Sequence, residues 1–139
     1  MTTRRVVFAA IISMLAGTAH AGLYLPVPVE VDLEKLFAQG DQVRASRGKP
    51  NEMSIACGTR VLGESAGSAT SLGFCEATDA DGDTVSCTTV NPSFVNAIST
   101  MSVHSFIAFS WDEDTRKCTR VSFSTRSSLP PKSILYGRK

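Results

Sequence analysis

The sequence predicts a small exported α+β domain: a small antiparallel sheet arranged as hairpin, short helix and hairpin, with an N-terminal helix, stapled by disulfides. Three observations lead to this fold class. The chain begins with the features of an export signal, and its four cysteines all follow that signal. Two stretches of alternating apolar and polar residues flank acidic turns. Two further stretches carry helix caps followed by apolar residues at helical spacing.

The export signal occupies residues 1–21. Arg4 and Arg5 precede an apolar stretch, Val6–Ala16, and Ala19-His20-Ala21 has the small-x-small pattern of a cleavage site. The apolar stretch is shorter than the roughly 20 residues that cross a bilayer as a helix. We therefore expect cleavage after Ala21 and no transmembrane segment in the mature chain, which would be periplasmic or secreted.

Length and charge restrict the domain number and the partner. Removing residues 1–21 from the 139 leaves 118 residues, the size of one domain. We expect a single α+β domain at 22–128 and a flexible C-terminal tail at 129–139, where Pro130 and Pro131 exclude regular structure. The mature chain has 12 Lys and Arg against 13 Asp and Glu. This near-neutral balance gives no electrostatic reason to expect binding to nucleic acid. The expected partner is therefore an unknown protein or envelope component.

A helix is predicted near the start of the mature chain. Asp32 can cap it, Gly40 can end it, and its apolar side would be formed by Leu33, Leu36 and Phe37. A strand is expected at Met53–Cys57, and Arg60-Val61-Leu62 can continue it. The small polar residues from 63 to 71 are expected to form a loop.

The first hairpin is expected at Leu72–Val90, with its turn at Asp79–Asp83. A two-residue Asp81-Gly82 turn would mix apolar and polar residues on both faces. A register shifted by one residue pairs Cys75 with Cys87 and Ala77 with Val85, which gathers the apolar residues on one face. A buried face specifies register strongly, so we favour the second register.

A second helix and a second hairpin follow. Asn91 is the expected cap and Pro92 the first helical residue. The hairpin runs from Ser102 to Thr125. One face of it would carry the apolar residues Val103, Ile107, Phe109, Trp111, Val121 and Phe123. This pattern places Cys118 on the opposite face.

The four cysteines predict two disulfides, because an even number in a small exported domain is typical of a disulfide framework. Their spacings contain no Cys-x₂₋₄-Cys pair, which structural zinc sites favour. In the favoured hairpin register Cys75 lies opposite Cys87, within bridging range. This leaves Cys57 to pair with Cys118.

Two motifs resemble functional sites, but the surrounding sequence does not provide the structure that such sites need. Gly63-Glu64-Ser65-Ala66-Gly67 matches the nucleophile elbow of serine hydrolases, with His104 as the available base. The mature chain is too short for an α/β-hydrolase, and no helical pattern follows Ser65. We predict that the protein is not an enzyme and has no catalytic residue. A small secreted serine hydrolase using Ser65 is the alternative.

The acidic hairpin tip is the second motif. Asp79, Asp81 and Asp83 resemble the start of a calcium loop, but glycine is at the fourth position and Val90 at the twelfth. We expect a solvated tip, and we predict no metal site and no cofactor. Weak calcium binding at the tip, and an inhibitor that presents the tip to a basic cleft, are alternatives left open.

The segment from Cys75 to Cys87 has the pattern Cys-x-Ala-x-Asp-x-x-Gly-x-Thr-x-x-Cys and resembles a hairpin in short exported proteobacterial proteins. The resemblance extends from about Gly73 to Lys132. That group has no assigned activity, so the resemblance implies a fold and no functional residues. We therefore expect a non-catalytic binding or structural module of the cell envelope or extracellular space.

Overall fold

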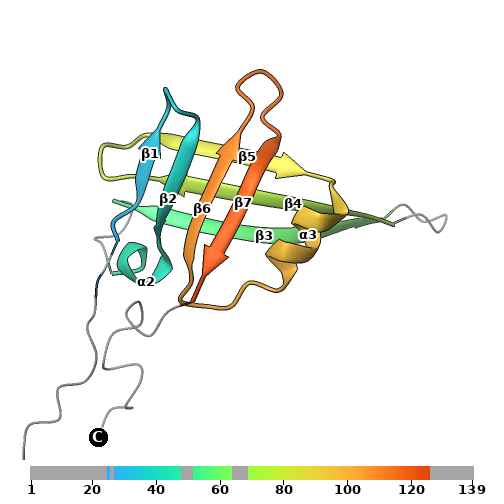
Figure 1. The fold of residues 1–139 in the computed structure, drawn as a ribbon, viewed down its shortest axis with the longest axis horizontal. Coiled ribbons are helices and arrows are strands. Elements are labelled where there is room, and N and C mark those ends of the chain that lie inside the picture. The colour runs from blue at the N-terminus through green and yellow to red at the C-terminus, as the bar shows by residue number, and fades with distance from the viewer. Residues whose placement is uncertain (1–24, 26, 48–51, 64–68, 126–139) are drawn as a thin grey trace, which may run out of the picture.

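A computed structural model describes residue 25 and residues 27–47, 52–63 and 69–125. These residues form two antiparallel sheets and two short helices (Figure 1). The strand order is β1-β2-β6-β7 in one sheet and β3-β4-β5 in the other. The elements are β1 (Glu30–Asp32), β2 (Phe37–Asp41), α2 (Gln42–Ala45), β3 (Ser54–Gly63), β4 (Ala69–Thr78), β5 (Thr84–Thr89), α3 (Pro92–Ser99), β6 (Phe106–Trp111) and β7 (Cys118–Ser124).

The predicted fold class, α+β with an N-terminal helix, is wrong. The described residues are mostly antiparallel strand, and they form two sheets instead of one. The strands of the two sheets cross one another in Figure 1, and α3 lies near one end of the three-stranded sheet. Two sheets can bury apolar faces against each other, so this chain does not need helices to cover a single sheet.

The predicted N-terminal helix is instead the β1–β2 hairpin. The Asp32 carboxylate accepts a hydrogen bond from the Lys35 backbone N–H at 2.8 Å, and this bond closes a turn. Leu36 has φ 53°, a left-handed conformation that does not continue a helix. The following residues pair with β6, with Ala38 opposite Phe109. Pairing across the sheet therefore overrides the local helical pattern, and Leu33 stays exposed.

The first hairpin has the predicted register. Cys75 lies opposite Cys87 and Ala77 opposite Val85, and all four side chains are buried. The helix after it is also confirmed, because the Asn91 side chain accepts a hydrogen bond from the Ser93 N–H at 2.9 Å.

The predicted pairing of the second hairpin is confirmed for the central residues and is wrong at the end near Cys118. Phe109 lies opposite Val121 as predicted. The register then shifts, because Ser110 pairs with Arg120 while Trp111 pairs with Cys118. This β-bulge inserts one extra residue in β7, and it turns Cys118 toward the buried face instead of away from it. The start of the hairpin also differs, since Val103 precedes β6 and is exposed.

The core lies between the two sheets, and hydrogen bonds join their edges at two places. The largest fully buried apolar side chains are Phe109, Ile107 and Val85. At one corner the Thr88 N–H donates to the Arg116 carbonyl at 3.1 Å. At another, the Val31 N–H donates to the Asp79 carboxylate at 3.3 Å. These bonds connect β5 to the start of β7, and β1 to the β4–β5 turn.

Several predictions concern residues outside the described ranges. They are the export signal at 1–21, the candidate nucleophile Ser65, and the tail at 129–139. No helix in the described part of the chain is long and apolar enough to span a membrane.

Gly73 offers a test of how closely α3 packs on the three-stranded sheet. A Cβ at this position would lie 2.9 Å from Ile98 Cδ1 of α3 and 3.1 Å from Thr89 Cγ2. We expect Gly73→Ala to lower the free energy of unfolding by about 1 kcal/mol, because the buried side chains of Ile98 and Thr89 must move away from the new methyl group. Gly63→Ala is the matched control, since no atom of the described residues lies within 4 Å of its Cβ position. Urea unfolding measures both, and equal effects would contradict this packing.

Candidate binding groove

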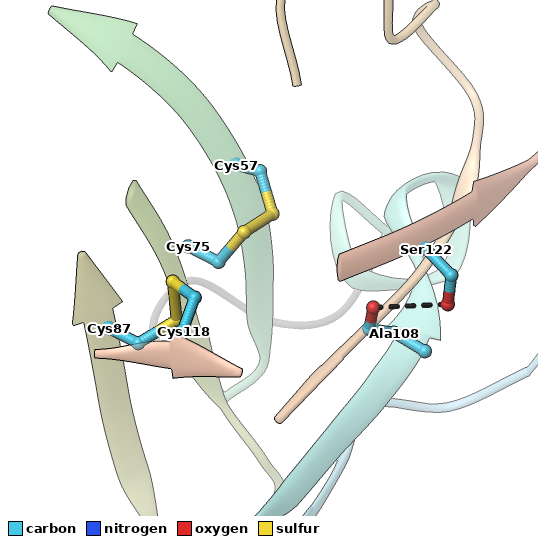
Figure 2. The surroundings of a disulfide bond; sticks show 6 residues. All are labelled: Cys57, Cys75, Cys87, Ala108, Cys118 and Ser122. Atoms are coloured by element: carbon cyan, nitrogen blue, oxygen red, sulfur yellow. Dashed lines mark hydrogen bonds between the residues drawn. A yellow bond between two sulfur atoms is a disulfide. The ribbon is translucent and has the colours of Figure 1, made fainter. Parts of the chain in front are cut away.

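All four cysteines form disulfides, Cys57 with Cys75 and Cys87 with Cys118 (Figure 2). The predicted pairing of Cys75 with Cys87 and of Cys57 with Cys118 is therefore wrong. The hairpin register behind that prediction was right, so the error has another cause.

The cause is that Cys75 has a cysteine opposite it on both neighbouring strands. β3 pairs with β4 along its whole length, which sets Cys57 opposite Cys75 on the side away from Cys87. Opposed residues in antiparallel strands alternate between narrow pairs without hydrogen bonds and wide hydrogen-bonded pairs, with Cα separations of about 4.5 and 5.5 Å. The Cys57–Cys75 Cα separation is 4.0 Å, which identifies the narrow pair. Cys75 and Cys87 then form the wide pair, and their side chains lie farther apart.

The second disulfide joins the two sheets. Cys87 lies on β5 and Cys118 on β7, with their Cα atoms 5.1 Å apart. The bulge in β7 allows this bond, because it turns Cys118 toward the core. The bond lies next to the Thr88–Lys117 bridge, so covalent and hydrogen bonds hold the same corner.

The two bonds should differ in their effect on stability. Loop-closure arithmetic gives about 3 kcal/mol for Cys57–Cys75 and about 4 kcal/mol for Cys87–Cys118. Replacing Cys87 and Cys118 with Ala should therefore lower the free energy of unfolding more than replacing Cys57 and Cys75, whose strands stay joined by the β3–β4 ladder. Urea unfolding gives the order, and non-reducing peptide mapping checks the pairing. A dominant Cys75–Cys87 peptide would refute it.

His104 and Gly63 lie near opposite ends of β3. His104 is in the turn before β6, has φ 66°, and lines a cavity with Ser54 and Ile55. Gly63 is the last residue of β3, nine positions beyond Ser54, which is about 30 Å along an extended strand. Ser65 is outside the described residues.

The acidic tip is held by Asp79, which is buried. One oxygen of its carboxylate accepts hydrogen bonds from the N–H groups of Asp81 and Asp83, at 3.1 and 3.0 Å. Its other oxygen accepts from Val31. Asp81 and Asp83 are exposed. Among the residues described, no group of three or more His, Cys, Asp and Glu side chains could hold a metal ion.

Asp79→Ala should lower the free energy of unfolding by about 1–3 kcal/mol, because three backbone N–H groups lose their acceptor. Asp83→Ala removes an exposed carboxylate from the same turn and should change it by less than about 0.5 kcal/mol. Thermal unfolding measures both variants. Millimolar calcium should leave the melting temperature of the unmodified protein unchanged, and a clear rise would mean that the tip binds the ion.

Two partly exposed carboxylates at the ends of strands in the four-stranded sheet have lowered pKa values. Hydrogen bonds from the Thr115 hydroxyl at 2.7 Å and the Thr115 N–H at 2.9 Å hold the pKa of Asp112 below its usual value. A hydrogen bond from the Lys35 ammonium at 2.6 Å does the same for the pKa of Asp32. Both carboxylates close turns, which explains the shifts without a catalytic role.

The most distinctive surface is a two-stranded ribbon that extends past the end of β5. β4 pairs with β3 from Ala69 onward, but it pairs with β5 only from Gly73. Residues 60–63 and 69–72 therefore project as a ribbon of two strands (Figure 1). The chain turns into α3 where β5 ends, and α3 packs over Gly73 at the base of the ribbon.

A groove of about 630 Å³ lies between this ribbon and α3. Its apolar walls include Val61 of the ribbon, Val95 of α3, and Val90 between β5 and α3. Val61 and Val90 are 70% and 63% exposed. Its other lining residues are small, amide-bearing or hydroxyl-bearing, and none of the described ones is charged. A second hollow adjoins it at Val90 and is lined by Leu72, Phe94 and Lys117.

Sequence reasoning missed this groove because it treated residues 63–71 as a loop. The predicted continuation of the strand through Arg60-Val61-Leu62 is confirmed in β3, but the start of β4 at Ala69 was not predicted. The exposure of Val90 depends on where β5 stops and α3 starts, which no local pattern specifies.

Comparison of the chain with protein-family models, with curated proteins and with solved structures finds no match. The groove and the disulfides are therefore the basis for an inference about function.

Proposed function

We propose that this protein is a non-catalytic binding module of the cell envelope or extracellular space, and that its groove holds an uncharged, partly apolar segment of another protein. The observation that carries this proposal is the uncharged groove with two exposed valines, Val61 and Val90, in its walls. Exposed apolar side chains gathered around a hollow are typical of sites that bind a partner.

The backbone beside the groove favours an extended polypeptide as the ligand. β5 ends at Thr89, opposite Gly73, so Ala69 and Ser71 of β4 have no strand on the side away from β3. In the described part of the chain, no hydrogen bond outside the sheets reaches their backbone groups. Free N–H and C=O groups next to apolar side-chain sites are the features by which sheet edges bind extended peptides. A charged ligand would find no opposite charge among the described groove residues.

The disulfides support both the location and the mode of binding. Disulfides persist in oxidising compartments such as the periplasm and the extracellular space. The Cys87–Cys118 bond lies beside the groove, since Cys118 lines the hollow that adjoins it at Val90. A binding site held in place by covalent bonds loses less conformational entropy when its ligand binds.

Site-specific photo-crosslinking in the native cell envelope tests the proposal. A photoreactive residue in place of Val90 should form an adduct with one protein, and the same residue in place of Leu33 should not. Leu33 is also exposed and apolar, but it lies in the β1–β2 turn on the other sheet. Val90→Glu should prevent capture of the same protein while leaving the melting temperature nearly unchanged, because the side chain is exposed.

Two results would contradict the proposal. One is equal crosslinking from the Val90 and Leu33 positions, which would indicate non-specific contact. The other is labelling of Ser65 in the folded protein by a fluorophosphonate probe, lost in Ser65→Ala, which would favour the serine hydrolase.

A further inference from the structure

β3 is an edge strand with an unusually long free side. It has ten residues and is the terminal strand of the β3-β4-β5 sheet. In the described part of the chain, no backbone hydrogen bond outside the sheets reaches it. The backbone groups that face away from β4 therefore lack partners within the described fold.

The residues that present these groups can be identified from the hydrogen-bond alternation. The Thr88 N–H points away from β4 to Arg116, so its neighbour Cys87 must direct its own groups toward β4. Cys75 then bonds to β5, and the narrow Cys57–Cys75 pair leaves the groups of Cys57 directed outward. By the same alternation, the outward residues of β3 are Ile55, Cys57, Thr59, Val61 and Gly63.

This edge lacks the features that normally keep sheet edges apart. Such edges are protected by short length, proline, bulges or several charges. β3 has no proline and one charged residue, Arg60, whose guanidinium lies 4.8 Å from the centre of the Phe74 ring. Its ladder with β4 runs without a register shift. An edge of this kind is suited to pairing with another strand.

We propose that β3 pairs with β3 of a second copy of this chain, antiparallel, about a two-fold axis at Thr59. In this register Leu62 faces Ala56 of the partner subunit, and Val61 faces the partner subunit's Cys57. Leu62 and Val61 are exposed, at 56% and 70%, whereas Ala56 and Cys57 are small and half-buried. The large apolar residues at one end of the strand therefore meet small residues at the other end of its copy.

Neighbouring registers are less favourable. A two-fold axis at Arg60 would place two guanidinium groups directly opposite each other, which is destabilising. An axis at Gly58 would place Leu62 opposite Ser54 of the partner subunit, and Val61 opposite the partner subunit's Ile55, whose side chain is already buried in its own core. The axis at Thr59 places Arg60 opposite the partner subunit's Gly58. The resulting pair is isologous and closed, so it ends at a dimer with one continuous six-stranded sheet.

Sedimentation of the full chain, produced with its own leader, tests the proposal. We expect twice the mass of one chain at micromolar concentration. Thr59→Pro should weaken the dimer about tenfold or more, because it removes outward N–H donors at the axis and leaves the β3–β4 ladder intact. Ser71→Pro is the matched control: the Ser71 N–H also points outward, but from the free edge of β4, and the dimer should persist.

Proline at position 59 could also disturb the folding of β3, so a second variant and a second measurement are needed. Thr59→Lys places like charges opposite each other at the axis and should also give monomers. In hydrogen exchange, the amides of Cys57, Thr59 and Val61 should be protected in the dimer, and those of Cys57 and Val61 should be exposed in either variant. A monomer at all attainable concentrations, or a dimer that survives both Thr59 variants, would overturn the proposal. A monomer whose β3 amides become protected only with a different protein would overturn it equally.

Discussion

The arrangement of the sheets depends on the corner where β5 meets β7. The Cys87–Cys118 disulfide and the Thr88 to Arg116 hydrogen bond join the two sheets there. The disulfide requires that Cys118 face the core, and the one-residue bulge in β7 provides this orientation. Without the bulge, Cys118 would point away from the core, because one residue changes the face on which a side chain lies.

The same corner positions the candidate groove. β5 cannot extend further along β4, because the chain leaves the corner at Thr89 and enters α3. The Asn91 cap and Pro92 start the helix immediately, so α3 lies across the sheet at Gly73. The part of β3 and β4 beyond this point is left without a third strand. The groove and the projecting ribbon are therefore consequences of where one strand ends.

The ribbon has two unpaired sides with different surroundings. The short free side of β4 lies beside α3 and the apolar groove, which suits a single extended segment with side chains to bury. The long free side of β3 has mostly small side chains and one charge, which suits pairing with a flat strand. A chain with two such sides can hold one partner in the groove and pair with a copy of itself along the other edge.

The sequence by itself determined features that depend on neighbours along the chain. The register of the β4–β5 hairpin followed from the apolar alternation around Cys75 and Cys87, and the start of α3 followed from Asn91 and Pro92. The use of cysteines in disulfides followed from their even number and from the prediction that the chain is exported. In each case the residues that interact are close in sequence, so local patterns contain the information.

Only the tertiary structure decided features that depend on strands far apart in the chain. The segment after Asp32 became a hairpin because β2 pairs with β6, about 70 residues later. Cys75 bonded to Cys57 instead of Cys87 because β3 lies beside β4 and forms the narrow pair there. The groove residues Val61 and Val90 come from separate segments, and their exposure depends on where β5 ends. In each case a residue or segment had more than one possible partner. Which partner it takes depends on how distant strands lie in space, and the pattern of one segment does not contain that information.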